Sequence, residues 1–130
     1  MGRLNHLQLS AHFSLHEFEC PCCHCVKLDP VLIEALEMLR AYISGVPIIV
    51  TSGYRCPKHN ASPAVDGATL SDHLLGVAAD IVVTGMDPKE LARAASCIDL
   101  IRRIGTYDDR GCVHVGVLER AGFASRWGDW

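Results

Sequence analysis

Histidine and aspartate side chains in two separate stretches of the chain could bind a metal ion. The segment 71–80, Ser-Asp-His-Leu-Leu-Gly-Val-Ala-Ala-Asp, contains His73 and Asp80, and His114 stands between two valines nearer the C-terminus. Two imidazoles and one carboxylate are the ligand set of an open zinc site, in which the metal acidifies a water molecule for hydrolysis. Asp80 also interrupts an apolar run, where a buried carboxylate needs a cation or hydrogen-bond donors to compensate it.

Each of these residues also has an ordinary structural explanation. A single histidine on a strand is more often a hydrogen-bonded core or surface residue than a metal ligand. An aspartate such as Asp80, after two alanines, could simply cap a turn. Spacing alone therefore favours the structural explanation, and metal binding needs support from longer motifs.

A second group of metal-binding side chains lies near the N-terminus. Four of the seven cysteines, Cys20, Cys22, Cys23 and Cys25, occur within six residues, and an odd total prevents all seven from pairing. The four are too close together to make four good bonds to one ion, so a distant ligand is expected, and Cys56 is the candidate. A zinc site, a disulfide from the cluster to Cys56 and reduced thiols remain open, with metal favoured for a protein made in the cytoplasm.

Helices with clear start signals flank the candidate residues. A capping box formed by Ser14 and Glu17 predicts a short helix that carries Phe18. Longer amphipathic helices are expected from Pro30 and from Pro88, each of which follows an aspartate that can cap the first turn.

Short apolar runs after these helices predict strands. Buried strands are expected at 47–51 and 78–83, and 104–117 has the pattern of a hairpin with a turn at 108–111. The polar segment 52–67 is a long loop, which we interpret as a wall of the active site. These elements predict an α+β fold with a small, mainly antiparallel sheet and helices packed on it.

Composition limits the class of protein. The 130 residues suit a single domain over 1–130, and 49% hydrophobic with 21% charged residues is a globular balance. The net charge of -3 gives no basic surplus for a nucleic-acid partner, and Glu17, Glu19 and Asp29 near the cysteines argue against a nucleic-acid zinc knuckle. No apolar run approaches the roughly 20 residues of a membrane helix. We expect a monomer that is made in the cytoplasm without a signal peptide and does not bind membranes.

Three ordered motifs resemble the D-alanyl-D-alanine carboxypeptidase family of zinc peptidases, which includes VanX-type dipeptidases and phage murein endopeptidases. The segment 71–80 is similar to the family motif SxHxxGxAxD, 52–60 resembles its SGYR-x-P-x-x-N segment, and His114 resembles its closing histidine. Residues 13–18 and 126–127 resemble the ends of small phage and bacterial members. The resemblance implies a Hedgehog-like zinc fold.

The resemblance also implies roles for single residues. Zinc would be held by His73, Asp80 and His114. Arg55 would lie near the scissile bond and bind a carboxylate or carbonyl oxygen of the substrate, for which guanidinium geometry is well suited. Ser71 would donate a hydrogen bond to the substrate or orient the turn of the first ligand. Small family members similar to this chain often carry a CxCxC run together with an arginine-cysteine pair.

The general base is where the chain departs from the family pattern. Family members place Glu, Asp or His two or three residues before the last ligand, but Cys112 and Gly111 occupy those positions here. Asp109, just upstream in the predicted turn, is the carboxylate that we assign as the base that accepts and returns the proton. Turn formation is the structural explanation for Asp109 and for its neighbour Asp108.

The family implies a function on the bacterial cell wall. A zinc peptidase of this kind would cut peptidoglycan stem peptides at bonds involving D-amino acids, either D-Ala-D-Ala or L-Ala-D-Glu. It would act at the cell wall, released by phage lysis or carried in a phage particle. The alternative is a non-catalytic zinc-binding recognition module of the same fold, as in the Hedgehog signalling domain. The missing base favours this module, whereas Arg55 favours catalysis.

Overall fold

One five-stranded sheet organises the part of the chain that the computed structural model describes, which is residues 7–63, 71–107 and 109–130. Its strand order is β1-β2-β4-β3-β5. All neighbouring strands are antiparallel except β3 and β5, which run parallel. The predicted α+β class with a mainly antiparallel sheet is therefore confirmed. The strands are β1 (Ile49–Ser52), β2 (Ala78–Val82), β3 (Arg103–Tyr107), β4 (Arg110–Gly116) and β5 (Arg126–Trp127).

The helices begin where the sequence predicts. In α1 (Pro30–Tyr42) the Asp29 carboxylate accepts a hydrogen bond from the amide of Val31 at 2.9 Å, and α3 (Pro88–Ala95) begins with the equivalent cap from Asp87. The predicted first helix is η1 (Leu15–Phe18), a single turn of 3-10 helix. In each case a side-chain oxygen satisfies an amide that the first helical turn leaves without a partner.

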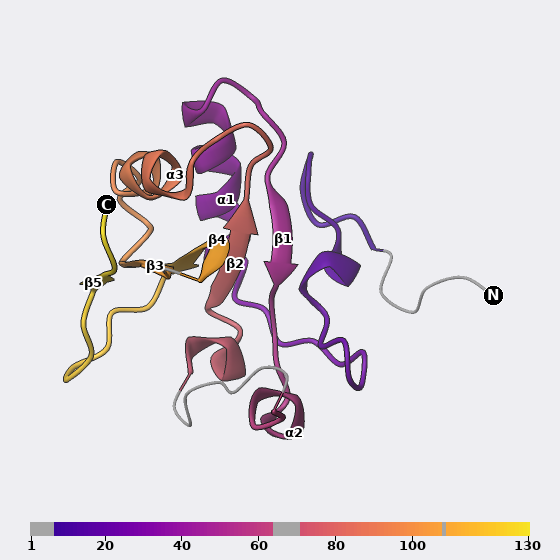
Figure 1. Ribbon diagram of the computed structural model, residues 1–130. Coiled ribbons are helices and arrows are strands. Elements are labelled where there is room, and N and C mark those ends of the chain that lie inside the picture. The colour runs from indigo at the N-terminus through magenta and orange to yellow at the C-terminus, as the bar shows by residue number, and fades with distance from the viewer. Residues whose placement is uncertain (1–6, 64–70, 108) are drawn as a thin grey trace.

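The hydrophobic core lies between one face of the sheet and the two longer helices. Figure 1 shows α1 and α3 next to each other, and α3 packs against β3 and β4. Alternate strand residues face this core, since successive side chains point to opposite faces of a strand. The strand residues of the core include Ala79, Ile81, Ile104, Val113 and Val115, all fully buried. The other face of the central strands is thereby left for polar side chains.

Some elements differ from the expectation. The predicted loop at 52–67 contains a short helix, α2 (Pro57–Asn60), and the segment before β2 forms η2 (Asp72–Leu75). The hairpin is tighter than predicted because β4 already begins at Arg110, and Asp108 lies outside the described residues. The two-residue strand β5 was not predicted at all. Among the described residues, no helix has both the length and the apolar character that crossing a membrane requires.

Candidate metal centre

A row of paired residues crosses the whole sheet and contains two of the three predicted ligands. Ser52 of β1 lies opposite Asp80 of β2, which lies opposite His114 of β4. Gly105 of β3 pairs with His114, and Trp127 of β5 pairs with Gly105. Because side chains alternate along a strand, Asp80 and His114 project from the face opposite the core.

The third predicted ligand, His73, comes from η2 rather than from a strand. Ser71 caps this turn, and its Oγ accepts a hydrogen bond from the amide of His73 at 3.2 Å. Gly76, with a φ of 73°, ends the turn and leads into β2. The Nδ1 of His73 donates to the carbonyl oxygen of Gly53 at 2.7 Å, and its Nε2 lies 3.2 Å from Oδ1 of Asp80.

The three side chains form a donor set that suits a zinc ion. One ligand atom from each of His73, Asp80 and His114 lies within 4.8 Å of the others, and all three residues are buried. Because Nδ1 of His73 donates to a carbonyl, Nε2 is the ring nitrogen that would present a lone pair to a bound metal ion. His114 turns Nδ1 to the same carboxylate oxygen at 3.2 Å and its Nε2 to Asp72. Three potential ligand atoms thus converge in a buried space, as a metal site requires.

The charges of the three side chains also favour a cation at the centre. Burial raises the pKa of Asp80, but hydrogen bonds from His114 and His73 outweigh burial and hold that pKa well below its ordinary value. Burial lowers the pKa of His114, but the carboxylates of Asp72 and Asp80 outweigh it, so the pKa is raised. The centre therefore favours one positive charge next to Asp80, which a proton or a metal ion can supply.

Asp72 is a functional residue that the sequence reasoning missed. Its buried carboxylate accepts hydrogen bonds from Arg103 and, at 2.7 Å, from Arg120, and its Oδ2 lies 3.5 Å from Nε2 of His114. Burial raises the pKa of Asp72, but the neighbouring imidazole of His114, the hydrogen bond from Arg120 and the charge of Arg103 lower it to about 2. A carboxylate behind a ligating imidazole fixes its tautomer and orientation. The only signal in the sequence was an acidic residue directly before His73.

Trp127 is a second residue that only the structure reveals beside the centre. Its ring centroid lies 5.1 Å from that of His114, and the guanidinium of Arg103 lies 5.0 Å from the indole centroid. The indole covers Gly105 so closely that a Cβ at that position would collide with it. The C-terminal strand thereby packs an aromatic wall against the last predicted ligand.

The structure places Arg55 directly beside the predicted ligands. Its guanidinium donates to Oδ2 of Asp80 at 3.1 Å, to Oγ of Ser52 at 3.0 Å and to Oδ1 of Asn60 at 3.4 Å. Arg55 is 7% exposed, so these bonds form in a nearly dry environment. The arginine neutralises part of the Asp80 charge and is held rigidly by three acceptors.

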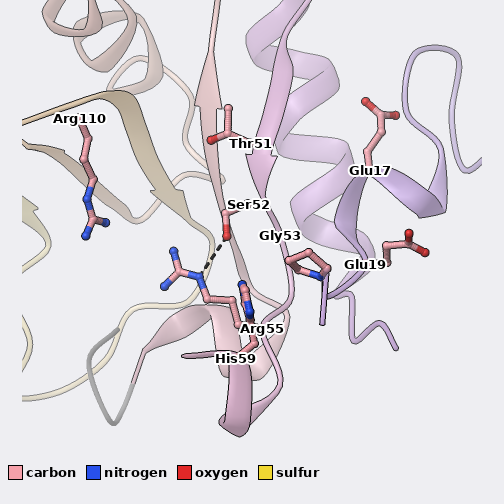
Figure 2. Close-up of a pocket in the computed structure, with 9 residues that line it drawn as sticks. Glu17, Glu19, Thr51, Ser52, Gly53, Arg55, His59 and Arg110 are labelled. Carbon is pink, nitrogen blue, oxygen red and sulfur yellow. Dashed lines mark hydrogen bonds between the residues drawn. The ribbon is translucent and has the colours of Figure 1, made fainter. Parts of the chain in front are cut away.

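Arg55 also lines an open pocket of about 330 Å³ on this side of the molecule. Figure 2 shows the hydrogen bond from its guanidinium to Ser52, and it also shows His59 of α2 and Arg110 of β4 among the residues that line the pocket. Glu17 and Glu19 lie on the other side of the view. The pocket is lined by Glu17, Glu19, Pro21, Thr51, Ser52, Gly53, Arg55, His59 and Arg110. Four residues of the predicted wall at 52–67 thus line the pocket, and residues 64–67 of that segment lie outside the described residues.

Two other predicted site residues, Ser71 and Asp109, do not belong to the group of three ligands. Ser71 caps η2 and thereby orients His73, one of its two predicted roles, and contact with a substrate stays a prediction. Asp109 is exposed in the hairpin turn. It precedes His114 by five residues, which along a strand corresponds to about 16 Å. The structure does not bring Asp109 to the three ligands, and its role as the base stays a prediction.

Cys112 occupies one of the two positions where the family pattern places a proton shuttle. It is half-buried and, two residues before His114, faces the same side of β4. Burial and the negative charge of Asp80 raise the pKa of the Cys112 thiol. A thiol that holds its proton this firmly is a poor general base near neutral pH.

The cysteine-rich segment meets the Arg55 loop. The Sγ atoms of Cys20, Cys23 and Cys56 all lie within 4.8 Å of one another, while Cys22 and Cys25 are exposed next to them. All seven cysteines belong to the described part of the chain, and none of them forms a disulfide there. Burial raises the pKa of Cys20, but the backbone amides of Cys56, Cys23 and Cys22 outweigh it and lower that pKa to about 7.

Comparison with known proteins agrees with the geometry of the centre. The family model described as Peptidase M15 matches residues 11–116, a span that includes the three converging ligands, the Arg55 loop and the cysteines of the N-terminal cluster. None of the curated proteins matches the chain. Because the matched span covers most of the 130 residues, and because the expected resemblance rests on motifs inside it, the chain belongs to the Peptidase M15 family.

Proposed function

We propose that this chain is a zinc-dependent peptidase that hydrolyses peptidoglycan stem-peptide bonds involving D-amino acids. Membership of the Peptidase M15 family supports peptidase activity. The observation that carries the proposal is the convergence of ligand atoms from His73, Asp80 and His114 within 4.8 Å of one another. Zinc held by these residues would polarise the scissile carbonyl and acidify a water molecule.

Arg55 is proposed to bind an oxygen of the substrate next to these ligands. Its guanidinium has five N–H donors in a planar fork, and hydrogen bonds to Ser52, Asn60 and Asp80 already fix its orientation. A donor held rigidly before substrate arrives needs little reorganisation when negative charge develops on a carbonyl oxygen. Its second task is to keep Asp80 ionised as a ligand.

The pocket beside Arg55 suits a short peptide with charges of both signs. Arg55, Arg110 and His59 line it and can bind the carboxylates of a stem peptide, while Glu17 and Glu19 can attract an amino group. Such a substrate occurs in the wall, so the proposed place of action is the cell wall, reached after phage lysis or within a phage particle. The pocket is compatible with cleavage at D-Ala-D-Ala and at L-Ala-D-Glu.

Asp109 remains our proposal for the general base. The support is that its neighbour Arg110 lines the pocket and that it stands on the hairpin whose second strand carries His114. The role requires the hairpin turn to bend toward the centre when a peptide is bound. If so, Asp109→Ala should reduce kcat by about 10² to 10⁴. Asp99→Ala, which removes an exposed carboxylate elsewhere, is the matched control.

Digestion of purified muropeptides, followed by mass spectrometry, tests the proposed reaction. Zinc-loaded protein should release D-alanine or split the peptide after L-alanine, and the mass of the products identifies the bond. His114→Ala should abolish cleavage, whereas His12→Ala, an exposed histidine bonded to Glu37, should retain it. Intact muropeptides after incubation with folded, zinc-loaded protein would refute the peptidase proposal.

The second candidate is a zinc-binding module that recognises the peptide without cutting it. The position of Asp109 favours this candidate. Among the described residues, the contacts at the centre involve two carboxylates, the ligand Asp80 and Asp72, so no further carboxylate stands there as a general base. Saturable binding of a muropeptide with no product, unchanged in Asp109→Ala, would support the module. Turnover that depends on zinc would exclude it.

A further inference from the structure

We propose that Cys20, Cys23 and Cys56 form a second metal site, which holds a zinc-class cation through thiolates and fixes the loop that carries Arg55. Their three sulfur atoms come from two segments 33 residues apart in the chain and lie within 4.8 Å of one another. Soft thiolate ligands select zinc among the common divalent ions of cells. The site is separate from the His73, Asp80 and His114 centre and does not depend on peptidase activity.

Backbone amides surround two of the three sulfur atoms. The amide of Cys56 donates to the sulfur of Cys20, and the amide of His59 donates to the sulfur of Cys56. Two backbone bonds of 2.8 Å, from the amide of His24 to Cys20 and from that of Cys20 to Cys25, close the turn. Amide donors compensate the negative charge of thiolates, as the ligands of a metal site require.

The backbone conformation of His24 also indicates that residues 20–25 form a defined turn. Its φ is 62°, a left-handed conformation that is uncommon for a residue other than glycine. Such a conformation persists where the surrounding structure demands it. Here it lies directly after Cys23, between the two backbone hydrogen bonds that close the turn.

Cys56 brings the third sulfur from the loop after β1. Its amide donates to the sulfur of Cys20 at 3.4 Å, and its own sulfur accepts from the amide of His59 at 3.4 Å. The two segments are already in close contact, since the amide of Tyr54 donates to the carbonyl of Phe18 at 2.8 Å. A metal bound to all three sulfurs would therefore link two segments that are already in contact.

The fourth ligand comes from the exposed rim of the cluster. Cys22 and Cys25 are exposed and belong to the same short segment as Cys20 and Cys23. Either can complete tetrahedral coordination by a change of its exposed side chain. We assign Cys25, because the amide of Cys20 donates to the carbonyl of Cys25 at 2.8 Å, which holds residue 25 next to a sulfur-bearing residue of the cluster.

The proposed metal would restrain the segment that contacts His73 and Asp80. The segment Gly53 to Cys56 supplies the carbonyl that accepts from Nδ1 of His73, and it carries Arg55, which contacts Asp80. The amide of Arg55 also donates to the carbonyl of His73 at 3.2 Å. Fixing Cys56 thus restricts the motion of the residues that orient one imidazole and one carboxylate of the centre. We call Cys56 a positioning residue for this reason.

Metal stoichiometry of the purified full-length chain tests the site. After dialysis against zinc, the Cys56→Ser variant should contain one zinc ion per chain fewer than the wild type. Elemental mass spectrometry measures this zinc content. Cys97→Ser, which removes an exposed thiol outside the cluster, should hold the same amount as the wild type. Equal zinc in Cys56→Ser and the wild type would overturn the proposal. Loss of one zinc in Cys25→Ser but not in Cys22→Ser supports the fourth ligand, and the reverse result replaces it by Cys22.

A spectroscopic experiment on folded protein covers the case in which the serine variant does not fold. The double variant His73→Ala, His114→Ala retains the cysteine site, so after cobalt loading it should show the near-ultraviolet charge-transfer absorption of thiolate ligands. A cobalt spectrum without these bands would overturn the proposal. So would a disulfide between the cluster and Cys56, found by peptide mapping of freshly purified, unreduced protein. Peptidase activity is not a readout here, so its absence would leave this test unaffected.

Discussion

The Oδ2 atom of Asp72 lies 3.5 Å from Nε2 of His114, the ring nitrogen on the side away from Asp80. This carboxylate therefore stands behind the imidazole and favours the tautomer in which Nδ1 carries a lone pair toward the centre. Asp72 is itself anchored by Arg103 and Arg120, so the imidazole cannot easily turn. Partners of this kind raise the basicity of a ligating imidazole as well as orienting it.

The first prediction concerns this partner of His114. Asp72→Asn should weaken zinc binding at the centre by about 10- to 100-fold, because the amide neither fixes the imidazole tautomer nor balances its charge. Competition with a chelator, at a temperature where circular dichroism shows the variant to be folded, measures the affinity. Asp99→Asn, at an exposed position, should bind zinc like the wild type.

The same substitution should lower stability, because it removes a negative charge between two arginines. Breaking a buried ion pair from one side costs about 3 to 5 kcal/mol, and the remaining amide oxygen recovers part of that cost. Denaturant unfolding of metal-free protein measures the change. If Asp72→Asn lowered stability but left zinc affinity intact, Asp72 would have a purely structural role.

The second prediction concerns the planar fork of Arg55. Arg55→Lys keeps the positive charge but cannot reach Ser52, Asn60 and Asp80 together, so a substrate oxygen would lose a rigid donor. We expect kcat/KM for a muropeptide to fall by about 10² to 10³, with zinc content nearly unchanged. Arg93→Lys on the exposed face of α3 is the control. Normal turnover in Arg55→Lys would limit the role of Arg55 to its charge.

The third prediction compares two glycines that share a left-handed backbone. Gly76 has a φ of 73° and Gly45 a φ of 80°, so alanine should cost both about 1 to 2 kcal/mol in backbone strain. A Cβ at Gly76 would also collide with the backbone of Lys27, whereas a Cβ at Gly45 would meet nothing within 4 Å. Gly76→Ala should therefore lower the free energy of unfolding by about 1 to 3 kcal/mol more than Gly45→Ala. Equal losses, measured with denaturant, would contradict the close packing seen at Gly76.

The fourth prediction is the pH dependence of metal-free protein. The pKa of His114 is raised above its ordinary 6.5, so its stabilising contribution is full below that pH and is lost as pH rises through the folded-state pKa. The pKa of Asp72 is lowered from 3.8 to about 2, so its contribution is full above 3.8 and is lost as pH falls toward 2. Metal-free protein should be most stable between these limits.

Bound zinc should offset the loss of stability at high pH, because zinc competes with the proton for the imidazoles. The increase in Tm on adding zinc should therefore grow between about pH 5 and about pH 8. Thermal unfolding at a series of pH values, with and without chelator, measures both curves. In the His114→Ala variant, the increase in Tm that zinc causes by binding at this centre should be lost. An increase in Tm that is independent of pH would argue against imidazole ligands.

Much of the fold could be predicted from sequence because local signals determine it. Asp29 with Pro30, and Asp87 with Pro88, marked the starts of α1 and α3, and the apolar runs marked β2 and β4. The period-two alternation of a strand is enough to place His114 on the face opposite its two valine neighbours. The motif from Ser71 to Asp80 and the family resemblance then singled out the three ligands.

What the sequence determined was the identity of the chemical groups, because residue types, caps and hydrophobic periods are local properties of the chain. Only the tertiary structure showed that Asp72 supports His114 and that Trp127 covers Gly105, since those contacts join segments far apart in sequence. It also decided which cysteines meet, and it left Asp109 in an exposed turn. The physical reason is that sheet pairing and core packing, which fix distances between remote side chains, depend on the whole chain at once.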